Sequence, residues 1–84
     1  MNQAIMLINK VNTIKSAAHN KHTIVIEYVD AKGNSSSREL EPYEFNGTVL
    51  NAYCLLRNEI RKFKISQIRS VTETDTLFEP RFDI

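Results

Sequence analysis

Residues 36–56 read SSRELEPYEFNGTVLNAYCLL, in which two β-prone runs flank the dipeptide Asn46-Gly47. Asn-Gly is the pair that best fits a type I′ turn, because both central residues of that turn take positive φ. The sequence therefore predicts a β-hairpin, with one strand over about residues 36–45 and the next over about residues 48–56.

Further strand signals lie on both sides of this hairpin. Residues 23–29 are β-branched and aromatic, and the turn residues 30–34 follow them. After the hairpin, a tight turn at residues 57–59 leads into a strand over about 60–65. A short helical turn at about 66–68 then precedes a last strand over about 69–74, and Pro80 keeps the tail out of the centre of a sheet. We therefore expect five short strands.

The chain begins with apolar residues at helical spacing. These are Ala4, Leu7, Ile8, Val11, Ile14 and Ala18. They predict an amphipathic helix over about residues 3–19, with Asn2 as N-cap and Asn20 in the left-handed position that ends it. The expected fold is α+β: this helix, then a strongly bent five-stranded antiparallel sheet over about residues 22–74 that curls into a partly closed barrel, and a short tail over 75–84.

Composition limits the function classes. A chain of 84 residues supports one domain, and its net charge of +1 excludes general attraction to nucleic acid. The single cysteine, Cys54, fits a reducing, cytoplasmic compartment as a small buried residue, and no apolar run is long enough to span a membrane. His19 and His22 lack the cysteine or carboxylate partners of a metal site. No catalytic motif is present, so we expect no enzyme, no metal and no cofactor.

Two segments resemble the WYL domain, a family found in bacterial transcription regulators. They are residues 38–45, RELEPYEF, and residues 50–63, LNAYCLLRNEIRKF, and the similarity extends over about residues 22–71. Thr48-Val49-Leu50 stands where the family has Trp-Tyr-Leu, and Ile65-Ser66-Gln67-Ile68 where it has Leu-Asp-Arg-Ile. The resemblance implies an Sm-like, SH3-type barrel that senses an effector, including single-stranded nucleic acid, usually beside a DNA-binding domain.

The candidate binding residues are basic or aromatic. Those at positions matching the family are Arg38, Tyr53, Arg57 and Arg61, and Lys62, Lys64 and Arg69 add a local excess of positive charge. Lys62, Lys64, Arg57 and Arg69 suit a phosphate backbone, with Tyr53 or Tyr43 to stack a base.

Strand alternation places Arg61 on the apolar face with Phe63 and Ile65, opposite Lys62 and Lys64. Arg61 there either pairs with a carboxylate such as Glu39 or Glu41, or with backbone carbonyls, or it binds an anion.

Two functions follow from these patterns. The first is a non-enzymatic binding module in a regulatory role, which recognises single-stranded nucleic acid or a nucleotide-like anion. The second is an assembly subunit, whose barrel edges form a homo-oligomer or bind a partner that carries a DNA-binding domain.

Overall fold

The computed structural model describes residues 3–81, with side chains from Leu7 onward. Helix α1 (Gln3–Asn20) is followed by strands β1 (His22–Val29), β2 (Ser35–Phe45), β3 (Val49–Cys54), β4 (Glu59–Lys64) and β5 (Ile68–Leu77). A short 3-10 helix, η1 (Ile65–Gln67), joins β4 to β5. The expected α+β class is confirmed. Asn2 and Phe82, and the side chain of Ala4, lie outside what the structure describes.

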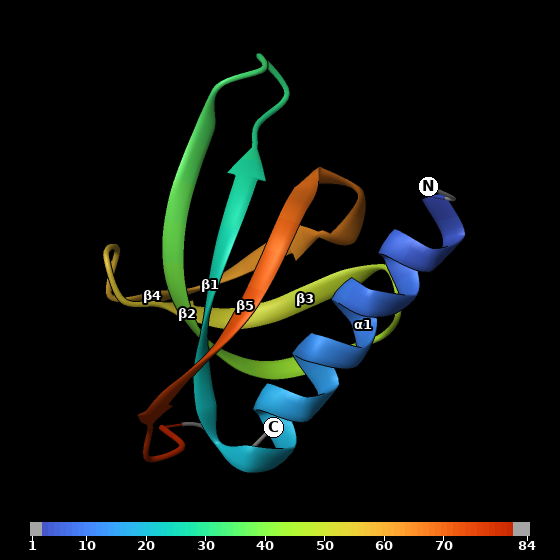
Figure 1. Ribbon diagram of the computed structural model, residues 1–84. Helices are drawn as coiled ribbons and strands as arrows, with labels where there is room; N and C mark the ends of the chain where they lie inside the picture. Colours follow the sequence, from blue (N-terminus) through green and yellow to red (C-terminus); the bar gives the residue numbers. More distant parts are fainter. Residues whose placement is uncertain (1–2, 82–84) are drawn as a thin grey trace.

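The five strands form one antiparallel sheet in the order β4-β3-β2-β1-β5. Figure 1 shows that the sheet is strongly bent, with β3 and β4 running across the direction of β1 and β5. A shift of register between Pro42 and Glu44 marks a bulge in β2. The bulge begins at Pro42, which has no backbone N–H to donate to the neighbouring strand. In the described residues β4 and β5 do not pair with each other, so the barrel stays open between them.

The β2–β3 hairpin is confirmed, but the predicted type I′ turn is wrong. Gly47 takes a positive φ of 96°, whereas neither Asn46 nor Thr48 does. The side chain of Asn46 explains the difference, because its Oδ1 accepts hydrogen bonds from the backbone N–H groups of Thr48 and Val49 at 2.9 and 2.8 Å. Asn46 therefore stabilises the turn through its side chain, and its own φ stays negative.

The end of α1 also differs from the prediction. Lys21, with φ 59°, takes the left-handed position that we expected at Asn20. Asn20 remains helical and donates a side-chain hydrogen bond to Glu73 of β5 instead. Strand β5 runs to Leu77, three residues beyond its expected end, because it stays paired with β1 as far as the pair His22 and Leu77.

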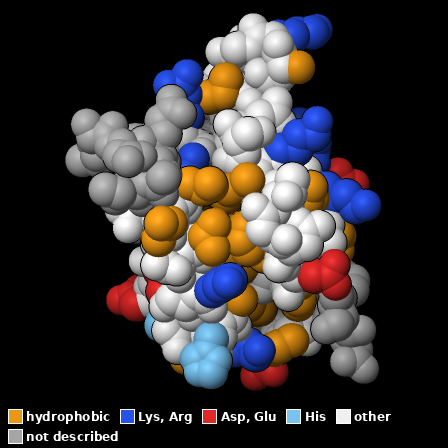
Figure 2. Space-filling model, turned by 90° about the vertical axis from the view of Figure 1, so that its right-hand side faces the viewer, with side chains coloured by type: hydrophobic (Ala, Val, Ile, Leu, Met, Phe, Trp, Pro, Cys, Tyr) orange, Lys and Arg blue, Asp and Glu red, His pale blue; other side chains and the backbone are white. Residues whose placement is uncertain are grey.

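The core lies between α1 and the bent sheet. It consists of Ile14, Ala17, Ile24, Ile26, Leu40, Leu50, Ala52, Cys54, Phe63, Ile65 and Ile68. Among the helix residues whose side chains the structure describes, Ile14 and Ala17 in the second half contribute to it. Leu7 and Ile8, which belong to the same predicted stripe, are 44% and 56% exposed. Figure 2 shows apolar side chains gathered on the face that carries α1, with Lys and Arg side chains around them.

Candidate functional site

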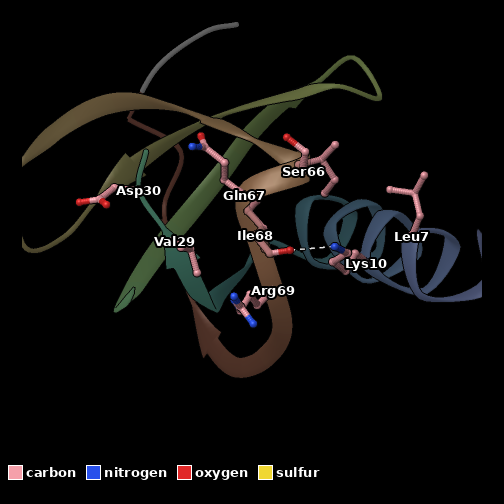
Figure 3. Close-up of a pocket in the computed structure, with 9 residues that line it drawn as sticks. Leu7, Lys10, Val29, Asp30, Ser66, Gln67, Ile68 and Arg69 are labelled. Atoms are coloured by element: carbon pink, nitrogen blue, oxygen red, sulfur yellow. Dashed lines mark hydrogen bonds between the residues drawn. The ribbon is translucent and has the colours of Figure 1, made fainter. Parts of the chain in front are cut away.

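A groove separates the first half of α1 from η1 and the ends of β1 and β5. Its volume is about 790 Å³. The apolar part of its lining comes from Leu7, Val29, Ile65 and Ile68, and its polar part from Lys10, Asp30, Ser66, Gln67 and Arg69. Figure 3 shows Leu7 and Lys10 on the helix side and Asp30 at the opposite end. A concave apolar surface with a few polar groups at its rim is the usual form of a small-molecule site.

The two cations of the groove lie on different elements. Lys10 is half-buried on α1, and its Nζ donates a hydrogen bond of 2.8 Å to the carbonyl of Ile68. Arg69, the next residue of β5, is exposed. The Lys10 contact neutralises no charge, because a backbone carbonyl carries none. This end of the groove is therefore positive.

The opposite end is negative. Asp30 Oδ1 accepts backbone hydrogen bonds from Lys32 and Asn34, both at 2.9 Å. The bond from Asn34 is the main reason that the pKa of Asp30 lies below its usual value. Gln67 sits between the two ends and accepts a hydrogen bond of 2.7 Å from the hydroxyl of Tyr28. The groove is thus polarised, and an anion is favoured only beside Lys10 and Arg69.

The seven predicted binding residues do not form one surface. Tyr53, Lys62 and Lys64 share the outer face of β3 and β4, because their cross-strand neighbours are Ile60, Asn51 and Val49. Arg57 is exposed in the turn between these strands. The other three predicted residues lie elsewhere: Arg61 on the opposite face of β4, Arg38 on β2 and Arg69 in the groove.

Arg61 is the clearest correction. It faces the same side as the buried Phe63, as predicted, but it is exposed rather than held against the core. Neither predicted carboxylate pairs with it, because Glu39 accepts a hydrogen bond from Thr23 and Glu41 binds Arg81. Within residues 3–81 the sheet ends at β4, and no strand of this part of the chain covers Arg61. Arg38 is half-buried and donates to the carbonyl of Ser37 at 3.2 Å.

Sequence reasoning missed a second polar cluster on the outer face of β2 and β3. Glu41 is only 3% exposed, and its two oxygens accept from Arg81 Nε at 3.0 Å and Nη2 at 3.2 Å. The guanidinium carbon of Arg81 lies 4.3 Å from the centre of the Tyr53 ring. The predicted base-stacking residue Tyr53 is therefore covered by the tail. No signal in the sequence indicated this, because Arg81 follows Pro80 in a segment without periodicity.

Lys10 was also missed, although the sequence carried a signal for it. Lys10 stands three residues after Leu7 and four before Ile14, and this spacing places all three on one helix face.

The end of α1 is fixed by a third cluster, centred on the carboxylate of Glu73. It accepts hydrogen bonds from Ser16 at 2.8 Å and Asn20 at 3.1 Å, and contacts Nδ1 of His22 at 2.7 Å. These bonds, that of Asn20 first, hold the pKa of Glu73 below its usual value. His22 of β1 thus contacts a single carboxylate of β5, while Ser16 and Asn20 tie the helix to the sheet.

Comparison with known proteins complements this geometry. The sequence matches the model of the WYL domain over residues 9–73. Among solved structures, the chain is similar to Proteasome accessory factor B/C (PafBC) of Arthrobacter aurescens, with a TM-score of 0.75 and 16% identity. The match covers 84% of this chain and 12% of that chain, and at this identity it supports the fold. A comparison with curated proteins finds no match. Within residues 3–81, no helix has the length and hydropathy that crossing a membrane requires.

Proposed function

We propose that this chain, which belongs to the WYL domain family, is a binding module that takes a nucleotide-like anion in the groove between α1 and η1. The observation that carries the proposal is the pairing of Lys10 and Arg69 at one end of an apolar groove. A phosphate lies beside these two cations, and a base lies on Leu7, Val29 and Ile68. The role is non-enzymatic and regulatory.

Two features support this orientation of the ligand. Asp30 holds a negative charge at the far end of the groove, which repels a phosphate from that end. Gln67 lies between the ends, and no hydrogen bond of its Nε2 is found among residues 3–81, so that this group donates to a base or a ribose.

A longer ligand has a path out of the groove. Lys64 precedes η1 directly, and Lys62 lies on the same face of β4. A single-stranded oligonucleotide with one nucleotide in the groove therefore places its next phosphates near these lysines. The proposed contacts are then Lys10 and Arg69 for the first nucleotide, and Lys62 and Lys64 for the strand.

The experiment compares a labelled mononucleotide with a short single-stranded oligonucleotide at two salt concentrations. We expect both to bind, and the oligonucleotide to show the stronger salt dependence, because it releases more counterions. Lys10→Ala and Arg69→Ala each weaken binding of both ligands about tenfold, as expected for one lost charge-assisted contact. The double variant Lys62→Ala with Lys64→Ala weakens only the oligonucleotide.

Lys15→Ala is the matched control, since Lys15 is an exposed lysine of the same helix that does not line the groove. Its binding should equal that of the wild type. Loss of binding in Lys15→Ala to the same extent as in Lys10→Ala would show a diffuse charge effect and contradict the groove. An affinity that does not change with salt would contradict the proposed phosphate contacts as well.

Assembly is a second candidate function, because the sheet order leaves β4 and β5 at its two ends. Exposed apolar side chains lie on or beside these strands, namely Ile60 at 36%, Leu56 at 66% and Leu77 at 71%. Unpaired edges of this kind join to strands of other chains. Light scattering at increasing concentration tests this: Ile60→Lys should lower the mass of an oligomer, and a wild type that stays monomeric would exclude self-assembly.

A further inference from the structure

The tail of the chain folds back over the outer face of β2 and β3. After β5 ends at Leu77, the backbone N–H of Phe78 donates to the carbonyl of Lys21 at 2.9 Å. The Phe78 ring then meets the Tyr43 ring edge to face, with centroids 5.7 Å apart. The backbone N–H of Arg81 donates to the Tyr43 hydroxyl at 2.8 Å. The sheet therefore contacts the tail at two residues, the aromatic Phe78 and, three positions later, Arg81.

The arginine point has the form of a guanidinium receptor. Glu41 offers both oxygens to the guanidinium, the Tyr53 ring stacks on it, and Tyr43 Oη donates to Glu41 at 2.9 Å. Glu41 is almost fully buried, and burying a carboxylate is costly unless a cation pairs with it. This surface thus requires a cation. Arginine fits better than lysine, because the planar guanidinium can donate to both carboxylate oxygens at once.

Most residues of the tail are exposed. Leu77, Glu79, Pro80 and Arg81 are all exposed, and the Arg81 side chain keeps 47% of its surface. Beneath the tail is a cavity of about 360 Å³, whose lining includes Thr23, Glu41 and Phe78. The tail thus has few buried apolar contacts, and a ligand that displaces it must restore the cation on Glu41.

We propose that Glu41, Tyr43 and Tyr53 form a docking site for an arginine-bearing segment of a partner protein, and that residues 78–81 occupy this site in the absence of the partner. The partner segment carries an aromatic residue three positions before its arginine, as the tail does. It takes the place of Phe78 and Arg81 and releases the tail from the sheet. This site is separate from the groove, so the two proposals stand or fall independently.

The test uses the blocked tetrapeptide Phe-Glu-Pro-Arg as probe, followed by NMR of the full chain. We expect Arg81→Ala to bind it, with shifts at Tyr43 and Tyr53. The wild type should bind at least about tenfold more weakly, because Arg81 competes as a tethered ligand. A peptide with citrulline, which has the same shape without the charge, should not bind. Arg57→Ala is the matched control: it removes an exposed arginine outside this site and should behave as the wild type.

Three results would overturn the proposal: equal binding of the citrulline peptide, unchanged binding when Glu41→Gln is added to Arg81→Ala, or no binding. If Arg81→Ala does not fold, the wild type at high peptide concentration gives the answer, since displacement must shift the Phe78 amide. An unmoved Phe78 amide then contradicts the proposal. Dimerisation of the wild type with the same shifts would assign the site to the tail of a second copy instead of a partner.

Discussion

The two halves of α1 have opposite relations to the sheet. The second half is buried through Ile14 and Ala17 and tied to β5 through Glu73, whereas the first half leaves Leu7 44% exposed. The contrast shows how a small domain combines stability with access. The second half of the helix covers the core, and the first half forms one wall of the groove in Figure 3.

The largest effect on stability should come from the buried second half of α1. Ile14 is fully buried against the sheet, so Ile14→Ala removes buried methyl groups and leaves a cavity. We expect the free energy of unfolding to fall by about 2–5 kcal/mol. Chemical denaturation followed by circular dichroism measures this. A loss as small as that of Leu7→Ala would contradict the division of the helix.

The Glu73 cluster should give an intermediate effect. Glu73→Gln keeps the shape but removes the charge that Ser16, Asn20 and His22 contact, and we expect a loss of about 1–2 kcal/mol. Because the folded-state pKa of Glu73 lies below 4.5, the wild type gains this stability above that pH and loses it as pH falls through the folded value.

Denaturation at a series of pH values measures the Glu73 effect. The wild type and Glu73→Gln should converge in strongly acidic solution, and Glu79→Gln serves as control because Glu79 is exposed in the tail. A constant difference at every pH would contradict the role of the charge.

The smallest effect on stability should come from the exposed first half of α1. Leu7→Ala removes an exposed side chain, so we expect the free energy of unfolding to change by less than about 0.5 kcal/mol. Nucleotide binding should nevertheless weaken several-fold, because Leu7 lines the groove. Ile8→Ala is the matched control, since Ile8 is exposed on the same turn and is not part of the lining. Equal binding by the two variants would remove Leu7 from the site.

Local patterns predicted the elements well because each depends on neighbouring residues. Strand alternation and turn chemistry located β1 to β4 to within a few residues. The turn at Asn46 shows the limit of such rules: the dipeptide indicated the hairpin, but competition between the Asn46 side chain and the backbone decided the turn type. Local rules name the residues of a turn more reliably than its dihedral angles.

The binding surface was harder to predict because it depends on which strand ends the sheet. Alternation placed Arg61 on the correct face, but its exposure follows from the position of β4 at the end of the strand order. Glu41 found its partner in Arg81, forty residues away along the chain, and no periodic pattern links the two. The family assignment does not depend on Arg61, since the spacing of the whole segment from residue 9 to residue 73 supports it.

The single thiol of the chain belongs to Cys54, the last residue of β3, which is fully buried and pairs with Leu40 of β2 and Glu59 of β4. A thiol reagent reaches this buried sulfur only when the core at this end of β3 opens, so the labelling rate reports that opening directly. The labelling rate of the Cys54 thiol therefore measures local unfolding around β3 without an engineered probe.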